Sequence, residues 1–329
     1  MLKKVKLGII GLGYIGQIHF KHSLALPNAE VIAVADISAK ALSKARKTGI
    51  KHIYTDYESL LQRPDIDAVV IGLPTHLHLQ CAEKAAEAHK HIFLEKPIAR
   101  NVPEARKILT AARKYNVKLM VGYPLRFNDD FKQARKEIQA GFLGDVESAH
   151  ATYISSGPFF HRAEGYSPVP VPEWWFDESL TGGGVLIDLG SHIINLLRWY
   201  FGEVTNIKGY FGHRFNLSFE DSAICIVKFN SGTTAIMNVG WYSQSYTLTL
   251  NLLGTVRSAT IEHKPGSPIL TAIQLLSTGN SKFYKPHMQE LQHFLSCIIK
   301  DIPPSPSGED GLKDLEVIEK AYKNQIVLQ

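Results

Sequence analysis

The chain of 329 residues contains few cysteines, and the three present, Cys81, Cys225 and Cys297, lie far apart in the sequence. A sparse, odd number provides neither a disulfide framework nor a cysteine zinc site. It is typical of proteins kept in a reducing cytosol, so we expect a cytoplasmic protein.

Long hydrophobic runs and blocks of like charge are also missing. No apolar run approaches the ~18 residues of a membrane span, and the basic start of the chain is followed by a stretch too short and too rich in glycine for a signal peptide. The formal net charge is only +5, without a Lys/Arg cluster. We therefore expect neither a membrane nor nucleic acid as a partner.

The first part of the chain alternates short apolar runs with helical patterns, which predicts a parallel sheet covered on both faces. The predicted helices begin near residue 14 and cover 38–47, 78–89 and 102–115. The predicted strands are 5–10, 30–36, 52–56, 68–73, 91–95 and 118–123. We expect an α/β fold whose N-terminal Rossmann dinucleotide-binding domain covers 1–122.

The second part has a different pattern, in which most strands follow one another without helices. Asn-Ser-Gly at 230–232 and Gly254-Thr255 are typical hairpin turns. Strands are predicted near Val146 and at 207–213, 222–230, 233–242, 246–254, 256–263 and 268–276. Helices are predicted at 129–140, 182–202, 287–300 and 309–325. We expect a C-terminal α+β domain over 123–329, with a large, mostly antiparallel open sheet and a last helix that can pack back on the first domain.

The sharpest local motif is GLGYIG, which directly follows the first predicted strand and opens a helix. In a dinucleotide site, Gly11 allows the tight turn, Gly13 the approach of a pyrophosphate, and Gly16 close helix–strand packing. Asp36 ends the second strand about 20 residues after Gly16, where an acid binds the adenosine ribose hydroxyls. The alternative is a tight turn with a solvated acid. A carboxylate repels a 2′-phosphate, so the sequence favours NAD over NADP.

Two further stretches, GLPTHLH (72–78) and LEKPIA (94–99), lie where parallel strands end, which is the usual ligand side of such a sheet. Lys96 is poorly placed for packing, although a surface salt bridge would also explain it. His76 and His78 lack the further ligands of a metal site, so we expect structural or cofactor contacts and no metal.

The stretch GGGVLIDLGSHIINLLRWYFG (182–202) reads as a buried helix, yet it carries Asp188 and His192. Residues four apart share a helix face, and Asn195 extends the same stripe. A buried Asp–His pair can merely hold a helix in place. An imidazole that titrates near neutral pH is also suited to take a proton during catalysis.

With these residues in view, the chain resembles the glucose–fructose oxidoreductase, inositol dehydrogenase and rhizopine-catabolism family (Gfo/Idh/MocA) over nearly its whole length. GLGYIG with Asp36 resembles the dinucleotide fingerprint, EKPIA the Glu-Lys-Pro signature, and Asp188 with His192 the Asp-x-x-x-His motif. LPTHLH is similar to Pro-Asn-x-x-His, with Thr75 in the Asn position. GYPLRF resembles the segment between the domains, and GEDGLKDLEVIEKAY resembles the closing helix.

The chain departs from the family at two places, both on the substrate side. Asn195 stands where the family often has an aspartate, and the loop PVPEWWFD is unusually rich in tryptophan. Trp174 and Trp175 form either a stacking wall for a sugar ring or a plain lid. These departures leave the identity of the substrate open.

The resemblance implies an NAD-dependent dehydrogenase of a sugar, inositol or related polyol. It assigns catalysis to Lys96, His192 and Asp188. Its cofactor-binding residues would be Gly11, Gly13, Tyr14, Ile15, Gly16, Asp36, Pro74, Thr75, His78, Glu95, Lys96 and Arg126. Its substrate-binding residues would be Lys96, Arg126, Trp174, Trp175, Asp188, His192 and Asn195.

The resemblance also implies a homodimer or homotetramer, formed through the open sheet of the second domain. Two other functions are represented among similar proteins: an NAD-using glycosidase that oxidises a ring carbon transiently, and a non-catalytic NAD-binding regulator. The presence of Lys96, Asp188 and His192 disfavours the regulator. The substrate, the carbon oxidised and the physiological direction are not readable from the sequence. The sequence also leaves open which of Lys96 and His192 accepts the proton.

Overall fold

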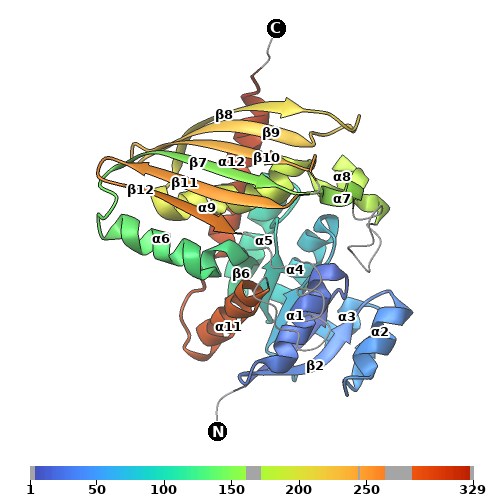
Figure 1. The fold of residues 1–329 in the computed structure, drawn as a ribbon. Helices are drawn as coiled ribbons and strands as arrows, with labels where there is room; N and C mark the ends of the chain where they lie inside the picture. Colours follow the sequence, from blue (N-terminus) through green and yellow to red (C-terminus); the bar gives the residue numbers. More distant parts are fainter. Residues whose placement is uncertain (1–3, 161–171, 244, 264–283, 327–329) are drawn as a thin grey trace. The chain divides into compact units, whose positions relative to one another are not determined.

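A computed structural model describes residues 4–160, 172–243, 245–263 and 284–326 (Figure 1). The chain divides into two compact units, each discontinuous in sequence. The first contains Met1–Pro124 and Ser267–Leu312, and the second contains Leu125–Gly266 and Lys313–Gln329. This division differs from the predicted one, which assigned everything after residue 122 to the second domain. The predicted strand at 268–276 lies outside the described residues.

The first unit is built on a parallel sheet of six strands in the order β3-β2-β1-β4-β5-β6. This order and the parallel pairing are those of a dinucleotide-binding Rossmann fold. The strands are β1 (Val5–Ile10), β2 (Ala29–Ala35), β3 (His52–Tyr54), β4 (Ala68–Ile71), β5 (His91–Glu95) and β6 (Leu119–Gly122). All residues of β4 and β6 are buried, as expected for strands covered on both faces.

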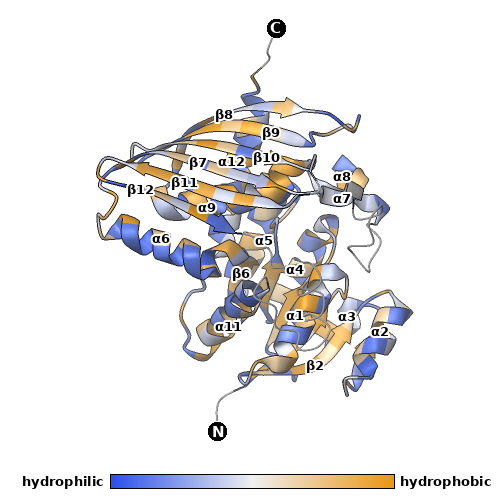
Figure 2. Ribbon diagram, viewed as in Figure 1, coloured by the Kyte–Doolittle hydropathy of each residue, from blue (hydrophilic) through white to orange (hydrophobic). Residues whose placement is uncertain are grey.

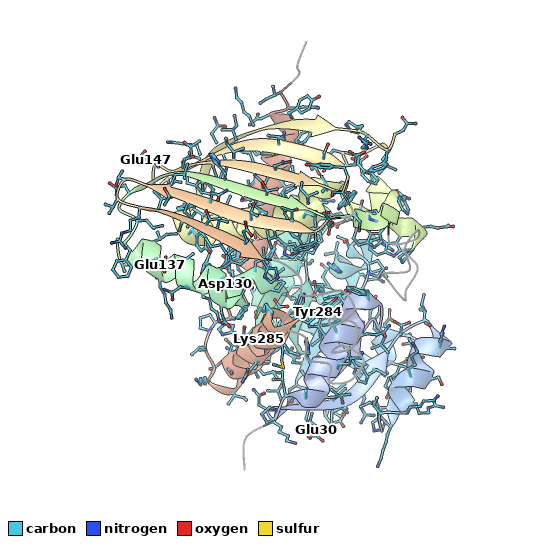
Figure 3. All side chains as sticks on the ribbon, viewed as in Figure 1. Glu30, Asp130, Glu137, Glu147, Tyr284 and Lys285 are labelled. Carbon is cyan, nitrogen blue, oxygen red and sulfur yellow. The ribbon has the colours of Figure 1, made fainter. Side chains whose placement is uncertain are left out.

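The helices of the first unit follow the predicted alternation with strands. They are α1 (Tyr14–Ala25), α2 (Ala39–Arg46), α3 (Tyr57–Leu61), α4 (His78–Glu87), α5 (Val102–Lys114) and α11 (Lys285–Ile299), with the 3₁₀ turn η1 (Thr75–Leu77). The short helix α3 was not predicted. Helix α11 contacts α1, β1, β5 and β6, which explains why the first unit includes this late part of the chain. Figure 3 labels Tyr284 and Lys285 at its beginning.

The second unit contains a sheet in the order β12-β11-β7-β10-β9-β8. Its strands are β7 (Val146–Ile154), β8 (Val204–Gly212), β9 (Ser222–Phe229), β10 (Thr234–Gly240), β11 (Thr247–Gly254) and β12 (Ser258–His263). Strands β7 and β10 pair in parallel and the other neighbours are antiparallel, so the prediction of a mostly antiparallel sheet is confirmed. Buried and exposed residues alternate along β9, which shows that one face is packed and the other open.

The second unit also contains short and long helices. These are η2 (Pro124–Phe127), α6 (Asp129–Gln139), α7 (Gly157–Phe160), η3 (Glu173–Phe176), α8 (Glu178–Thr181), η4 (Leu186–Gly190) and α9 (Ser191–Phe201). Helix α12 (Gly308–Lys323) begins in the first unit and continues in the second. Figure 2 shows hydrophilic residues along α6 and α2, whereas the strands are largely hydrophobic.

One helical stretch among the described residues, Glu178–Phe201, is long and apolar enough to cross a membrane by length and composition alone. The stretch is not an uninterrupted apolar run, because it contains Asp188, His192 and Arg198. Of the 18-residue segment that is apolar enough, 72% is buried inside the protein. The core helix of a folded domain can be equally long and apolar.

Candidate functional site

The glycine-rich loop between β1 and α1 has the geometry of a dinucleotide-binding turn. Gly11 has φ +85°, and a side chain there would lie 2.6 Å from the carbonyl oxygen of Gly72. A Cβ on Gly16 would lie 2.0 Å from the carbonyl oxygen of Gly11, so only glycine permits this close packing. A Cβ on Gly13 would meet nothing within 4 Å, which leaves room for a ligand to approach the backbone.

Helix α1 begins at this loop without a side-chain cap and without an acidic residue in its first turn. Uncapped N–H groups and the positive end of the helix dipole favour an anion such as a pyrophosphate. Asp36, directly after β2, accepts the backbone N–H of Leu12 at 2.5 Å and that of Ser38 at 2.6 Å. These bonds orient the carboxylate, and its remaining lone pairs can accept ribose hydroxyls. The residues present therefore fit a dinucleotide.

His78, at the beginning of α4, is fully buried and connects two of the predicted stretches. Its Nδ1 lies 2.9 Å from the carbonyl oxygen of Pro97, and its Nε2 lies 2.9 Å from that of Leu73. Burial lowers the pKa of His78, and the two carbonyl oxygens only partly oppose this effect. In the described structure His78 thus ties the end of β4 to the Glu95–Pro97 turn. Cofactor contacts of Pro74, Thr75 and His78 stay predictions.

Glu95 ends β5, and its carboxylate points inward rather than toward solvent. Oε1 lies 2.5 Å from Nε2 of His19 on α1, and Oε2 accepts the backbone N–H of Lys96 at 3.1 Å. Lys96 itself is half-buried. The turn that presents the lysine is therefore held by internal hydrogen bonds that do not involve its ammonium group.

Asp188 and His192 lie on the same helical stretch, but that stretch is not one continuous α-helix. Asp188 belongs to the π-helical turn η4, and His192 belongs to the α-helix α9 that follows. The expectation of uninterrupted α-helix is corrected here. Such π turns are rare and occur frequently at functional sites.

Asp188 and His192 differ from the neighbouring residues in how deeply they are buried. From Gly183 to Arg198 every residue is fully buried except Asp188 and His192, which are half-buried. Asp188 and His192 are thus the two residues between Gly183 and Arg198 that are partly exposed. A pair placed only to hold the helix would not need this exposure.

Aromatic side chains surround the pair within the second unit. The indole N–H of Trp241 donates to Oδ2 of Asp188 at 3.3 Å, and the ring of Tyr153 lies 6.0 Å from that of His192. Trp175 lies 6.3 Å from Trp241 and 5.6 Å from Trp174 between ring centroids. The predicted aromatic loop therefore leads through Trp241 to Asp188.

Asn195 and Arg126 lie deeper in the second unit than the predicted substrate contacts require. Asn195 is 1% exposed, and its amide donates to Oδ2 of Asp314 at 2.6 Å. Arg126 is 6% exposed and donates to the backbone oxygen of Asn195 at 3.3 Å. Arg198 forms an ion pair with the same Asp314. Both side chains thus contact a buried polar cluster, and their binding of ligands stays a prediction.

Sequence reasoning missed two residues of this region, Trp241 and Tyr153. Each lies at or just after the end of a strand, where an aromatic residue looks like part of the packed face. Their proximity to Asp188 and His192 depends on strand order. A local pattern does not report that order.

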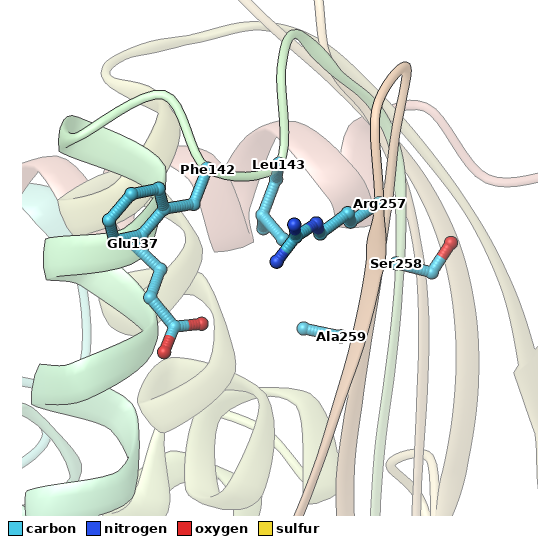
Figure 4. A pocket seen from close by; sticks show the side chains of 6 residues that line it. All are labelled: Glu137, Phe142, Leu143, Arg257, Ser258 and Ala259. Atoms are coloured by element: carbon cyan, nitrogen blue, oxygen red, sulfur yellow. The ribbon is translucent and has the colours of Figure 1, made fainter.

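A hollow of about 420 Å³ lies elsewhere in the second unit, beside the end of α6 and the start of β12 (Figure 4). It is lined by Glu137, Phe142, Leu143, Arg257, Ser258 and Ala259. None of these is a predicted site residue, and the hollow plays no part in the function proposed below.

Comparison with known proteins agrees with this geometry. Residues 5–123 match the oxidoreductase family with an NAD-binding Rossmann fold, and residues 131–260 match the GFO/IDH/MocA C-terminal domain. Together the two matches cover most of the chain. The first unit is thus an NAD-binding Rossmann domain.

Full-length relatives and solved structures extend the match. The chain is 30% identical to the uncharacterized oxidoreductase YrbE of Bacillus subtilis, over 98% of this chain and 95% of the relative. It is 27% identical to the scyllo-inositol 2-dehydrogenase (NAD(+)) of the same organism, over 96% and 93%. The scyllo-inositol dehydrogenase of Lactobacillus casei with NAD(H) and scyllo-inositol superposes with TM-score 0.81 at 23% identity, over 99% of each chain. The chain is therefore an oxidoreductase of the Gfo/Idh/MocA family.

Proposed function

We propose that this protein is an NAD-dependent dehydrogenase that oxidises a CH–OH group of an inositol, a sugar or a related polyol. The observation that carries the proposal is the half-buried pair Asp188 and His192 on an otherwise buried helical stretch. A purely structural pair would be fully buried. The similarity to the scyllo-inositol 2-dehydrogenase (NAD(+)) of Bacillus subtilis supports the substrate class.

Oxidation of an alcohol removes a hydride from carbon and a proton from oxygen. When bound, NAD supplies the hydride acceptor. Lys96 and His192 handle the hydroxyl proton, with Lys96 stabilising the charge that develops on oxygen and His192 acting as the base. Asp188 orients the imidazole or binds a neighbouring hydroxyl. The aromatic residues Trp174 and Trp175 form a wall against which a sugar ring stacks.

The test is a panel of inositols, sugars and polyols incubated with NAD while the absorbance of NADH is followed. A dehydrogenase produces NADH in proportion to substrate consumed. A glycosidase of the alternative type returns the hydride and releases a free sugar without net NADH. A regulator binds NAD and shows neither product, and that outcome would contradict the proposal.

We predict that the protein prefers NAD to NADP by at least about tenfold in kcat/KM, which corresponds to about 1.4 kcal/mol. Asp36 would face the 2′-phosphate, and the neighbouring Ile37 is 93% exposed and carries no charge. The double variant Asp36→Ser with Ile37→Arg should shift the preference toward NADP. Initial rates with both cofactors measure the ratio, with Arg46→Ser as a control. A native preference for NADP would mean that Asp36 does not bind the ribose.

We also propose that the open face of the second sheet joins two copies of the chain in a homodimer, or in a homotetramer built from such pairs. Exposed apolar side chains gather on three adjacent strands there. Ile226 lies opposite Ile236, and Ile224 lies opposite Tyr210, with exposed fractions between 41% and 51%. A row of paired, exposed apolar residues of this kind marks an association surface.

Ile226→Glu should therefore release monomers, because it buries a charge in the middle of the association surface. Light scattering after size exclusion measures the mass of the native protein and the variant. Val256→Glu is the matched control, since Val256 is 68% exposed in the turn between β11 and β12. A native protein that is already monomeric would remove this surface from the proposal.

We also propose that the protein is located in the cytoplasm. All three cysteines are free and buried. Burial raises the pKa of the Cys225 thiol to about 12, so it is unreactive at neutral pH. Unpaired cysteines of this kind suit a reducing compartment.

A further inference from the structure

A buried cluster behind Lys96 joins three elements of the first unit. His19 comes from α1, Glu95 from the end of β5, and Glu290 from α11. One side-chain nitrogen or oxygen atom of each residue lies within 4.8 Å of the corresponding atoms of the other two. His19 and Glu290 are 0% exposed and Glu95 is 7% exposed. Neither His19 nor Glu290 was singled out from the sequence.

The hydrogen bonds in this cluster are unevenly distributed. Both oxygens of Glu95 are engaged, one with His19 and one with the backbone N–H of Lys96. Both oxygens of Glu290 lack a hydrogen-bond partner of good geometry among the described residues. Two carboxylates this close and this deeply buried repel each other, so ionisation of both is strongly disfavoured. Glu290 is the one that lacks a donor of good hydrogen-bond geometry among the described residues.

The surroundings of Glu290 agree with a neutral carboxyl. Burial, and then the charge of Glu95, raises the pKa of Glu290 well above its ordinary value, while the backbone N–H of Tyr123 opposes this weakly. Burial, and then the charges of His19, His22 and Lys96, holds the pKa of His287 well below its ordinary value. The titratable side chains that act on Glu290 and His287 thus come from α1 and from β5 with its following turn, and Glu290 and His287 themselves lie on α11. The other contacting strands, β1 and β6, bring only the exposed Lys6.

The bonds of Glu95 connect two functional parts of the first unit. His19 lies on the helix whose N-terminus opens at the glycine loop, and Lys96 follows the strand that carries Glu95. The carboxylate thus links the helix that holds the pyrophosphate to the backbone of the proposed catalytic lysine. A displacement of about 1 Å in such a group can lower a rate by ~10²-fold.

We propose that His19, Glu95 and Glu290 form a positioning network that fixes Lys96 relative to helix α1, with Glu290 as the neutral member of the carboxyl pair. The positioning role rests on the proposed dehydrogenase function, whereas the protonation of Glu290 does not. The two statements are therefore tested by separate measurements.

The protonation is measured on the full-length protein by isotope-edited infrared spectroscopy of glutamate carboxyls at neutral pH. The native protein should show a protonated carboxyl band that is lost in Glu290→Gln and kept in Glu87→Gln, the control at an exposed site. The absence of this band from the native protein would overturn the proposal. A stoichiometric divalent cation found by elemental analysis, and lost in His19→Ala, would overturn it as well.

Stability against pH gives a second readout that needs no activity. A carboxyl whose pKa is raised on folding favours the folded state at low pH, and this contribution is lost as the pH rises from the unfolded value of about 4.3 toward the raised folded value. A glutamine at position 290 cannot ionise, so the Glu290→Gln variant does not lose this stability as the pH rises. Its melting temperature should therefore rise progressively relative to the native protein as the pH increases above about 5. A difference that does not change with pH would contradict a neutral Glu290.

The positioning role is measured by kinetics with a substrate found in the panel. Glu290→Ala and His19→Ala should lower kcat on the order of 10- to 100-fold while the Kd for NAD changes little. Glu290→Gln should recover at least about tenfold of that loss, because the amide replaces a neutral acid of the same shape. An unchanged kcat in both alanine variants would show that the cluster only supports the fold. If Glu290→Ala does not fold, the comparison of His19→Ala with His19→Gln decides. A native protein inactive on every substrate would fail the proposed function but leave the infrared and pH results decisive.

Discussion

Replacing Lys96 by Met is expected to lower turnover by about 10²–10⁴-fold while NAD affinity stays nearly native, since removal of an acid–base or charge-stabilising partner has this scale. The turn should survive the substitution. Two of its bonds, from the backbone N–H of Lys96 to the carboxylate of Glu95 and between His78 and the carbonyl of Pro97, do not use the ammonium group. NADH production measures turnover, and quenching of tryptophan fluorescence measures NAD binding.

Lys107→Met is the matched control for this experiment, because Lys107 is exposed on α5. It should leave both turnover and NAD binding unchanged. A decrease of less than about threefold in Lys96→Met would return Lys96 to the role of a surface ion-pair residue. The proton of the substrate would then have to be handled by His192 without it.

The second large effect is expected at Asp188 and His192, the pair proposed to act on the hydroxyl proton. His192→Asn and Asp188→Asn should each abolish most turnover, and the double variant should lose little more than the more damaged single variant. Groups that act as one unit lose their effect at the first removal. Asn at position 188 keeps an oxygen that can accept the N–H of Trp241, so the fold should tolerate it.

Melting temperature and turnover are measured on the same samples, with Asp145→Asn on the exposed loop before β7 as a control. A structural pair would behave differently. Either substitution would then leave a polar partner unsatisfied and cost about 1–3 kcal/mol of stability, while turnover per folded molecule stayed near native. That result would assign the acid and the imidazole to packing.

The sequence by itself determined the elements whose cause is local. Near-continuous apolar runs separated by amphipathic segments predicted the parallel sheet, because a strand buried on both faces cannot tolerate polar residues. Spacing also predicted the glycine loop. The observed φ of Gly11 and the contact that any Cβ on Gly16 would make show that no other residue satisfies this backbone.

Only the tertiary structure decided which of these elements meet. An amphipathic pattern shows that helix α11 has an apolar face, but it does not name the partner, and α11 joined the first unit through α1 and the strands around it. The π turn at Asp188 was likewise invisible, because its apolar residues fit an ordinary α-helix equally well. The indole of Trp241 reaches Asp188 from 53 residues away, and Glu290 reaches Glu95 from the far end of the chain. Such contacts depend on strand order and helix packing, so no local spacing encodes them.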